Sequence, residues 1–301
     1  MASMHWVSHS TILREIIMQW YIVTKSPLRV GVGKEPPLGS LVELAVVRIK
    51  LQGKSVPYIP GSSLKGVFRS IAMQLAKQKG LKVCQGVGKE TCMQLITVEG
   101  SSLGEYLESL LKKGNSYEAI KVFSENACLL CKIFGAPGLS SHVTFTDAYP
   151  VDNNGNVVEV PLGVRTGIAI DRRTGAVYER ALYQVEYIEP GARFRTMVLA
   201  TNLPNYAIGV LAKALMLINE GYMRIGCFKT RGFGEVGIED LELKIKGKNE
   251  GAKLLGLDNV DIEVDLTDCT EISGTWLIAR GVNAWKCLNK FEKVWDSVKF
   301  T

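Results

Sequence analysis

The sequence lacks several features that whole classes of protein require. No apolar run approaches the ~18–20 residues of a membrane-spanning helix; the best candidate, residues 207–218, is short, carries Lys213 and predicts a core helix. Only three histidines occur, and they form neither a Ser/His/Asp order nor a metal-type pair, which disfavours a histidine-based nuclease. No low-complexity tract is present, so global disorder is not expected.

Signals for export are missing from the sequence as well. Residues 1–10 contain no long apolar run and do not resemble a signal peptide. The seven cysteines are an odd number in a large chain, which favours a reducing compartment over a disulfide scaffold. We therefore expect a cytoplasmic protein with no membrane partner.

The composition that is present is that of a well-packed, mildly basic protein. Hydrophobic residues make up 47% of the chain and charged residues 22%, so 301 residues can bury a large core. We expect residues 1–301 to form a single elaborated domain. The net charge of +6 permits nucleic-acid binding but does not prove it, since many soluble enzymes are equally basic.

The most informative segment is Pro57–Arg69, a tight turn that leads into an amphipathic helix predicted for Leu64–Lys79. Ser62 or Ser63 can cap the free amides of the first turn. Lys65 and Arg69 follow at i, i+4 on one face. Free N–H groups, the helix dipole and two cations would form a phosphate site. The alternative is an ordinary capped helix with two solvated charges.

A second informative segment, Gly226–Gly234, holds three glycines, two cations and two aromatics just before an alternating strand. If the two segments meet in the fold, their cations flank one groove and neutralise phosphates. The candidate phosphate-binding residues of this loop are Lys229, Arg231, Gly232 and Gly234. Phe228 and Phe233 either stack on bases or pack in the core.

The order of predicted elements is compatible with a ferredoxin-like α+β fold. A strand, a helix and a strand occur in succession, and the same order follows again. The predicted strands are 16–24, 143–148, 194–201 and 236–245, and the predicted helices are 64–79, 103–113 and 202–220, with partial helix in 117–134.

Four cysteines are candidate metal ligands. Cys128 and Cys131 have the spacing of one half of a zinc site, and Cys84 and Cys92 are candidates for the other half. Four thiolates suit a closed, structural zinc site. The alternative is a set of buried or free thiols, because the gap between Cys84 and Cys92 is wider than usual.

Together, these motifs resemble the RAMP superfamily of CRISPR RNA-binding proteins. Pro57–Arg69 and Gly226–Gly234 are similar to the helix start and glycine-rich loop of the backbone subunit in type III (Csm/Cmr) effector complexes. Cys128–Gly135 and Val143–Ala148 also resemble Csm-type segments. The resemblance implies an RRM-like core with a mainly helical insertion (81–135) and a thumb-like hairpin (162–190). It also implies guide RNA, target RNA, further copies of the chain and other effector subunits as partners, and zinc at a matching place in some members.

In the family, the thumb wedges across guide–target duplexes. Ile168 and Ile170 are then candidate apolar wedges. Arg172 and Arg173 at the turn are candidate RNA contacts, or else a solvated tip.

Cleavage is the least determined part of the resemblance. Catalytic members use a loop aspartate with Mg²⁺ or Mn²⁺, and aligning Val46–Arg48 with the family's matching strand places Glu43 at that position. Glu35 is a second candidate, and Asp147 is expected to be structural. The function expected is a guide-RNA-binding backbone subunit with metal-dependent cleavage of target RNA. The alternatives are a non-catalytic structural subunit and a standalone RNA-processing endonuclease.

Overall fold

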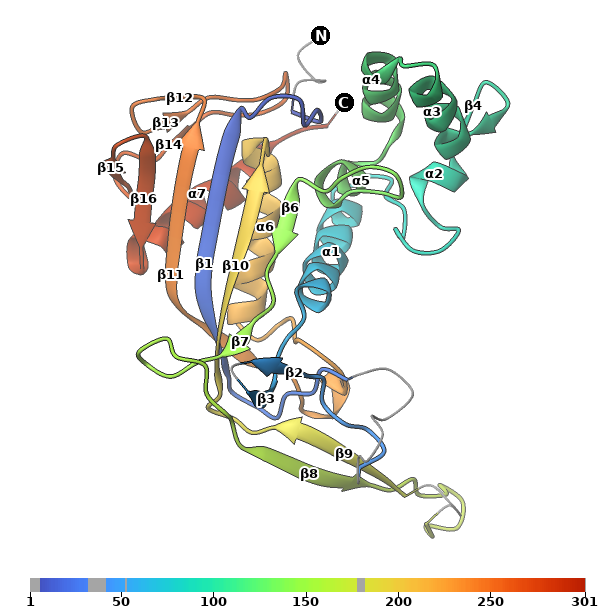
Figure 1. The fold of residues 1–301 in the computed structure, drawn as a ribbon, viewed down its shortest axis with the longest axis vertical. Helices are drawn as coiled ribbons and strands as arrows, with labels where there is room; N and C mark the ends of the chain where they lie inside the picture. The colour runs from blue at the N-terminus through green and yellow to red at the C-terminus, as the bar shows by residue number, and fades with distance from the viewer. Residues whose placement is uncertain (1–5, 32–41, 52, 178–181, 301) are drawn as a thin grey trace.

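The computed structural model describes residues 6–31, 42–51, 53–177 and 182–300. Its centre is a seven-stranded antiparallel sheet, here called the main sheet, in the order β15–β16–β11–β1–β10–β6, with β7 also paired to β10 (Figure 1). Its strands are β1 (Arg14–Thr24), β6 (Val143–Phe145), β7 (Tyr149–Pro150), β10 (Arg193–Thr201), β11 (Val236–Gly247), β15 (Glu271–Ser273) and β16 (Trp276–Arg280).

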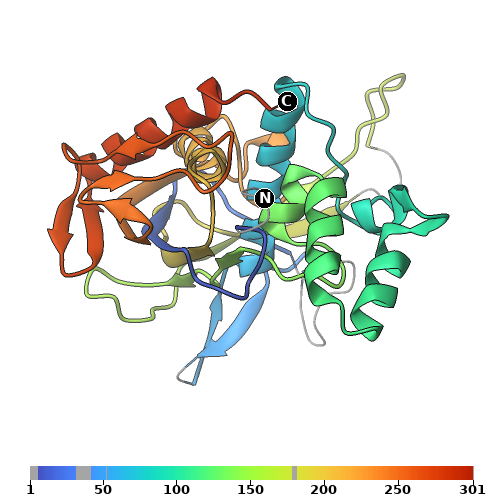
Figure 2. The same ribbon diagram turned by 90° about the horizontal axis from the view of Figure 1, so that it is seen from above.

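Six elements form the ferredoxin-like core, in the chain order β1–α1–β6–β10–α6–β11, where α1 is Gly61–Gln78 and α6 is Asn205–Asn219. This order and the antiparallel pairing confirm the expected α+β class. Alternate residues of β1 are buried because one face of the strand packs against helices. Helices α1, α6 and α7 (Val282–Ser297) lie on that face (Figures 1 and 2).

Helix α6 is buried along most of its length, since the main sheet covers one side and α7 packs against another. This agrees with the core helix expected around Lys213. Within the described ranges, no helix has the length and apolar character needed to cross a bilayer.

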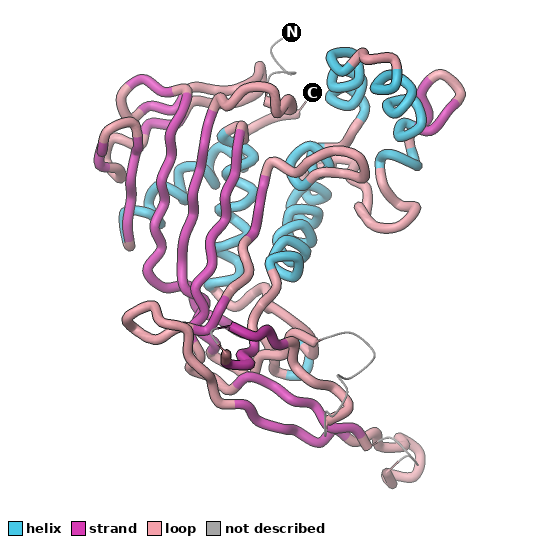
Figure 3. The backbone as a smooth tube through the Cα atoms, in the orientation of Figure 1, coloured by secondary structure: helices cyan, strands magenta, loops and turns pink. Residues whose placement is uncertain are grey.

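Between α1 and β6 the chain forms a group of short helices beside α1 (Figure 3). They are α2 (Cys92–Leu95), α3 (Leu103–Lys112), α4 (Ser116–Asn126) and α5 (Leu129–Phe134), with the hairpin β4 (Thr97–Val98) and β5 (Ser101–Ser102). Helix α3 begins with a reciprocal capping box between Ser102 and Glu105.

A long hairpin of β8 (Leu162–Gly167) and β9 (Tyr183–Ile188) projects from the lower end of the molecule in Figure 3. Nearby, β2 (Arg48–Leu51) pairs with β3 (Lys54–Pro57). Strand β9 also bridges two other segments, through Ile188 to Leu28 and through Val185 to Leu44. The hairpin root is therefore fixed to the body of the protein.

The sequence did not predict the C-terminal elements. A small sheet of β12 (Asn249–Glu250), β13 (Lys253–Leu254) and β14 (Val264–Asp265) precedes β15, β16 and α7. A disulfide between Cys269 and Cys287 ties α7 to this region. The cysteine count favours a reducing compartment over a disulfide scaffold, and the described residues hold this one disulfide, which the fold brings together although 18 residues separate its members.

Candidate nucleic-acid interface and cysteine cluster

The first turn of α1 lies against the end of β6. The helix begins at Gly61, earlier than predicted, and neither Ser62 nor Ser63 caps it with a side-chain hydrogen bond. Instead, the Asp147 carboxylate accepts a hydrogen bond from Gly61 N at 2.7 Å. The predicted serine cap is wrong. The Asp147 carboxylate, from a segment distant in sequence, accepts from the free Gly61 N–H and places a negative charge at the positive end of the helix dipole. Asp147 has a structural role, and it takes up part of the predicted phosphate site.

A hollow of about 510 Å³ beside this turn gathers one cation with several hydroxyls. Burial, and then the charge of Arg69, lower the pKa of Lys65. The hollow is lined by Gly61, Ser62, Lys65, Ser140, Ser141, Val143, Thr144 and Phe145. An ammonium and hydroxyls donate hydrogen bonds to phosphate oxygens. The hydroxyls of Ser140, Ser141 and Thr144 could not be assigned to this site from the sequence, because only the tertiary fold brings their loop to α1.

Arg69 does not line this hollow, although it follows Lys65 by one helical turn. Its Nη2 lies 3.6 Å from Cys131 Sγ and 3.8 Å from Cys84 Sγ. Its Nη1 donates to Gly135 O at 3.4 Å. The structure therefore places the two predicted phosphate ligands in different environments, with Arg69 at the cysteines.

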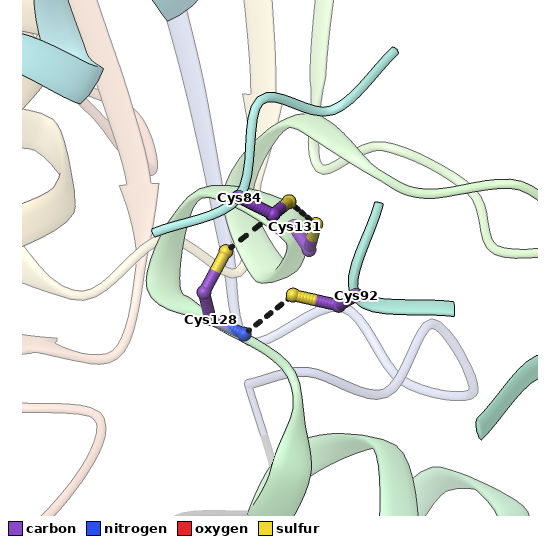
Figure 4. A group of neighbouring side chains, drawn as sticks. All are labelled: Cys84, Cys92, Cys128 and Cys131. Atoms are coloured by element: carbon purple, nitrogen blue, oxygen red, sulfur yellow. Dashed lines mark hydrogen bonds between the residues drawn. The ribbon is translucent and has the colours of Figure 1, made fainter. Parts of the chain in front are cut away.

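The four predicted metal ligands lie together (Figure 4): Cys84 comes from the loop after α1, Cys92 from the start of α2, and Cys128 and Cys131 from the N-cap and first turn of α5. Their sulfur atoms all lie within 4.8 Å of one another. Cys84 Sγ and Cys131 Sγ lie 3.2 Å apart. Sulfurs of a tetrahedral zinc site lie about 3.8 Å apart, given Zn–S bonds of about 2.3 Å. This cluster could therefore bind a metal such as zinc.

Contacts within the cluster favour a thiolate at Cys128. Hydrogen bonds from Cys131 and Cys92 lower the pKa of the Cys128 thiol. Cys131 and Cys92 donate these hydrogen bonds to Cys128 and therefore keep their protons. The pKa of the Cys131 thiol is raised, and that of the Cys92 thiol is raised to about 12. A thiolate is the form that binds metal, and the Arg69 guanidinium lies at two other sulfurs of the cluster, those of Cys84 and Cys131.

The glycine-rich loop presents its cations to solvent. Lys229, Arg231 and Gly232 are exposed, and the 3₁₀ turn η2 (Lys229–Arg231) holds the first two. Gly234 is buried, and its N–H donates to Pro27 O at 2.9 Å. Phe233 is only 3% exposed and packs in the core, whereas Phe228 remains half-buried.

A run of backbone hydrogen bonds connects this loop to the start of α1. Cys227 N donates to Arg29 O at 2.8 Å, and the residue after Arg29 accepts from Val47 N at 2.8 Å. Val47 O accepts from Tyr58 N at 3.3 Å, three residues before α1. We call these segments, 28–31, 44–47, 57–59 and 226–234, the platform. No hydrogen bond or ion pair between described residues joins Lys65 to the cations of the loop.

The hairpin tip carries the predicted arginines and apolar wedges in exposed positions. The Asp171 carboxylate accepts hydrogen bonds from Arg173 N (2.7 Å) and Thr174 N (3.2 Å) and so shapes the turn. Arg172 and Arg173 are exposed. Ile168 and Ile170 are 50% and 57% exposed.

The predicted catalytic carboxylate lies beside the hairpin root. Glu43 is exposed, next to Leu44, which hydrogen-bonds to β9 through its N–H and C=O groups. Glu186, on β9, is engaged elsewhere, because it pairs with Arg48 and accepts from Val46 N. Glu35 lies outside the described residues.

The two histidines of the described chain, at positions 9 and 142, lie beside each other and outside the platform segments of the sequence. His9 and His142 stack at 4.0 Å, and both His142 nitrogens face backbone carbonyl oxygens. No contact between described residues joins the His9 or His142 ring to the cations of the platform.

No curated protein matches the chain. The model of the RAMP superfamily matches residues 21–237, more than half of the sequence, and this range contains the platform, the cysteine cluster and the hairpin. The match and the ferredoxin-like core suggest a CRISPR-associated, RNA-binding subunit, and the chain belongs to the RAMP superfamily.

Proposed function

We propose that this chain is a guide-RNA-binding backbone subunit of a type III, Csm-like CRISPR effector complex. The observation that carries the proposal is the platform, because its hydrogen bonds join the glycine-rich loop to the start of α1. Lys65, with the hydroxyls around it, lies beside the start of the helix, while Lys229 and Arg231 are exposed on the loop. Cations of this kind bind phosphates without reading sequence, which suits a guide whose sequence varies.

The projecting hairpin supports contact with a target strand. Arg172 and Arg173 would neutralise phosphates, and the exposed Ile168 and Ile170 would wedge between bases, as apolar side chains do in other proteins that deform nucleic acids. Further copies of the chain and other effector subunits would complete the assembly.

The RNA-binding proposal is tested with the double variant Lys65→Ala/Arg231→Ala. Removing two phosphate contacts should weaken binding to unrelated single-stranded RNAs alike and reduce the salt slope by about 1.4, at ~0.7 per contact. Arg69→Ala is the matched control, since that side chain lies at the cysteines. If the double variant keeps its affinity and its salt slope, the platform is not the RNA site.

Cleavage of target RNA is the finer part of the proposal, and Glu43 would carry it. Its exposed carboxylate at the hairpin root could hold Mg²⁺ or Mn²⁺ near a scissile phosphate. In the reconstituted complex, Glu43→Ala should abolish cutting while guide and target binding persist, and Glu43→Asp should retain part of it. Cutting by Glu43→Ala at the normal rate would place catalysis at another residue or subunit. A wild-type complex that never cuts would favour the non-catalytic structural subunit.

A further inference from the structure

Two aromatic pairs lie where the hairpin meets the glycine-rich loop. In the outer pair, the rings of Tyr183 and Phe228 are nearly parallel, 12° apart, with centroids separated by 6.4 Å. In the inner pair, Tyr187 and Phe233 meet edge to face at 5.7 Å. Phe233 is buried, so the inner pair belongs to the core, whereas both rings of the outer pair are partly exposed. Tyr187 is half-buried as well, but its partner is not, so among these pairs only the outer one has two rings that a ligand can reach.

Glycines across the hairpin position the two tyrosines. Tyr183 pairs with Gly167, and Tyr187 pairs with Gly163. A Cβ atom at Gly167 would lie 2.3 Å from the Tyr183 ring, and one at Gly163 would lie 2.5 Å from the Tyr187 ring. Because Gly163 and Gly167 carry no side chain, both rings can lie across the hairpin. Gly167 thus allows the Tyr183 ring to lie beside Phe228 of the glycine-rich loop.

Phe228 is held in an unusual backbone conformation. Its φ of 56° and ψ of 28° lie in the left-handed region, which bulky residues rarely adopt. The neighbouring Cys227 N–H is fixed to Arg29 O. Strain of this kind concentrates at functional sites. Here it holds an aromatic ring beside Tyr183 at the exposed tip of the loop.

Two guanidinium groups accompany the outer pair. Arg29 lies 5.8 Å from the centre of the Phe228 ring, and it is buried and bonded to Leu44 O and Ala45 O. Arg231 lies 5.5 Å from the same centre, is exposed, and donates from Nη1 to Tyr183 Oη at 2.6 Å. The first cation is therefore structural, while the second is exposed and has further N–H donors, besides the one on Tyr183 Oη, that can engage a phosphate.

We propose that Tyr183 and Phe228 form a stacking site for one unpaired nucleobase, with Arg231 on the adjoining phosphate. The proposal rests on the proposed RNA-binding function and deepens it, because it adds a base contact to the phosphate contacts. Every base has a π face, so stacking tolerates any sequence. One bound nucleotide would then contact both β9, through Tyr183, and the glycine-rich loop, through Phe228 and Arg231.

The test compares affinity with salt dependence. Tyr183→Leu and Phe228→Leu should each weaken single-stranded RNA binding by about 5- to 150-fold. The salt slope should stay unchanged, because neither substitution removes a charge. Tyr183→Phe keeps the ring and should bind almost as wild type. Tyr222→Leu, at a side chain that is 77% exposed, is the control and should have no effect.

Photochemical cross-linking gives a second, direct readout. RNAs carrying a single 5-iodouridine at successive positions are irradiated with the wild-type chain, and the linked residue is identified by mass spectrometry. Links to Tyr183 or Phe228 are expected from one position. If no link forms at either ring and both leucine variants bind as wild type, the stacking site is refuted. The proposed function then still stands if Lys65→Ala/Arg231→Ala binds more weakly.

Discussion

At the scale of single residues, two cations one helical turn apart on α1 have different surroundings. Lys65 lines a hollow with hydroxyls, whereas Arg69 lies 3.6 and 3.8 Å from two cysteine sulfurs. A zinc ion held by four thiolates would carry a net charge of about −2, and the guanidinium would offset part of it. On the proposed function, one helix would therefore face two different anions, a phosphate at Lys65 and the metal-bound thiolates at Arg69.

We predict that Arg69→Met and Lys65→Met separate these roles. Loss of an outer ligand partner typically costs about 10- to 100-fold in metal affinity, so Arg69→Met should release zinc to a competing chelator more readily. Lys65→Met should hold zinc normally but lower the RNA salt slope by about 0.7. Elemental analysis of the purified wild type supplies the reference. Less than about a tenth of an equivalent of zinc would reject the site, since closed thiolate sites hold metal tightly.

His142 makes stability depend on pH. Burial, and then the charge of His9, lower its pKa from 6.5 to about 4, although two carbonyl oxygens favour the charged ring. The unfolded chain therefore binds a proton that the folded chain excludes. Stability is full above about pH 6.5 and falls toward pH 4, by at most about 3 kcal/mol. Urea unfolding at pH 7 and pH 5 should show a smaller loss for His142→Gln than for wild type. Equal losses would exclude His142 as the source.

At the scale of elements, glycine has opposite roles in two helices. A Cβ atom on Gly209 of α6 would lie 2.2 Å from Phe291 O and 2.9 Å from Trp295 Cβ on α7, so this glycine permits close helix packing. Gly66 of α1 has no atom within 4 Å of its missing Cβ. The same substitution thus meets a packed interface in one helix and open space in the other.

We predict that Gly209→Ala destabilises the protein by about 1–3 kcal/mol, because the two helices must move apart. Gly66→Ala should stabilise it by about 0.5–1 kcal/mol, since alanine lowers the entropy of the unfolded chain. Chemical denaturation of both variants measures the two effects. A Gly209→Ala protein as stable as wild type would mean that α6 and α7 are not packed this closely.

At the scale of the whole molecule, local patterns in the sequence predicted the core well and the site unevenly. The strand at 194–201 and the helix at 103–113 lie within one residue of β10 and α3. The start of α1 differed, because Asp147, distant in sequence, replaces the serine cap. The four cysteines were predicted as one group, but their contact with Arg69 was not. Hydrophobic periodicity indicates which residues face the core, but it does not indicate which residues distant in sequence will contact them.

The stacking pair illustrates the same limit. Phe228 was visible in the sequence as an aromatic within a glycine-rich loop, but Tyr183 lies 45 residues earlier on another element. Only the pairing of Tyr183 with Gly167, and of β9 with the platform, brings the two rings together. The C-terminal elements beyond Gly247 were not predicted, although they complete the cover of α6.

The disulfide between Cys269 and Cys287 links this C-terminal region to α7, and hence to the stability of the whole chain. The disulfide closes a loop across 18 residues. Because this restricts the conformations of the unfolded chain, it should add about 3 kcal/mol to the free energy of unfolding. We predict that Cys269→Ala/Cys287→Ala unfolds at a lower denaturant concentration than oxidised wild type. The reduced wild type should unfold at about the same point as the variant, and a reductant should not weaken the variant further. If reduction destabilises the variant as strongly as wild type, the lost stability comes from the other cysteines, and the disulfide contributes little.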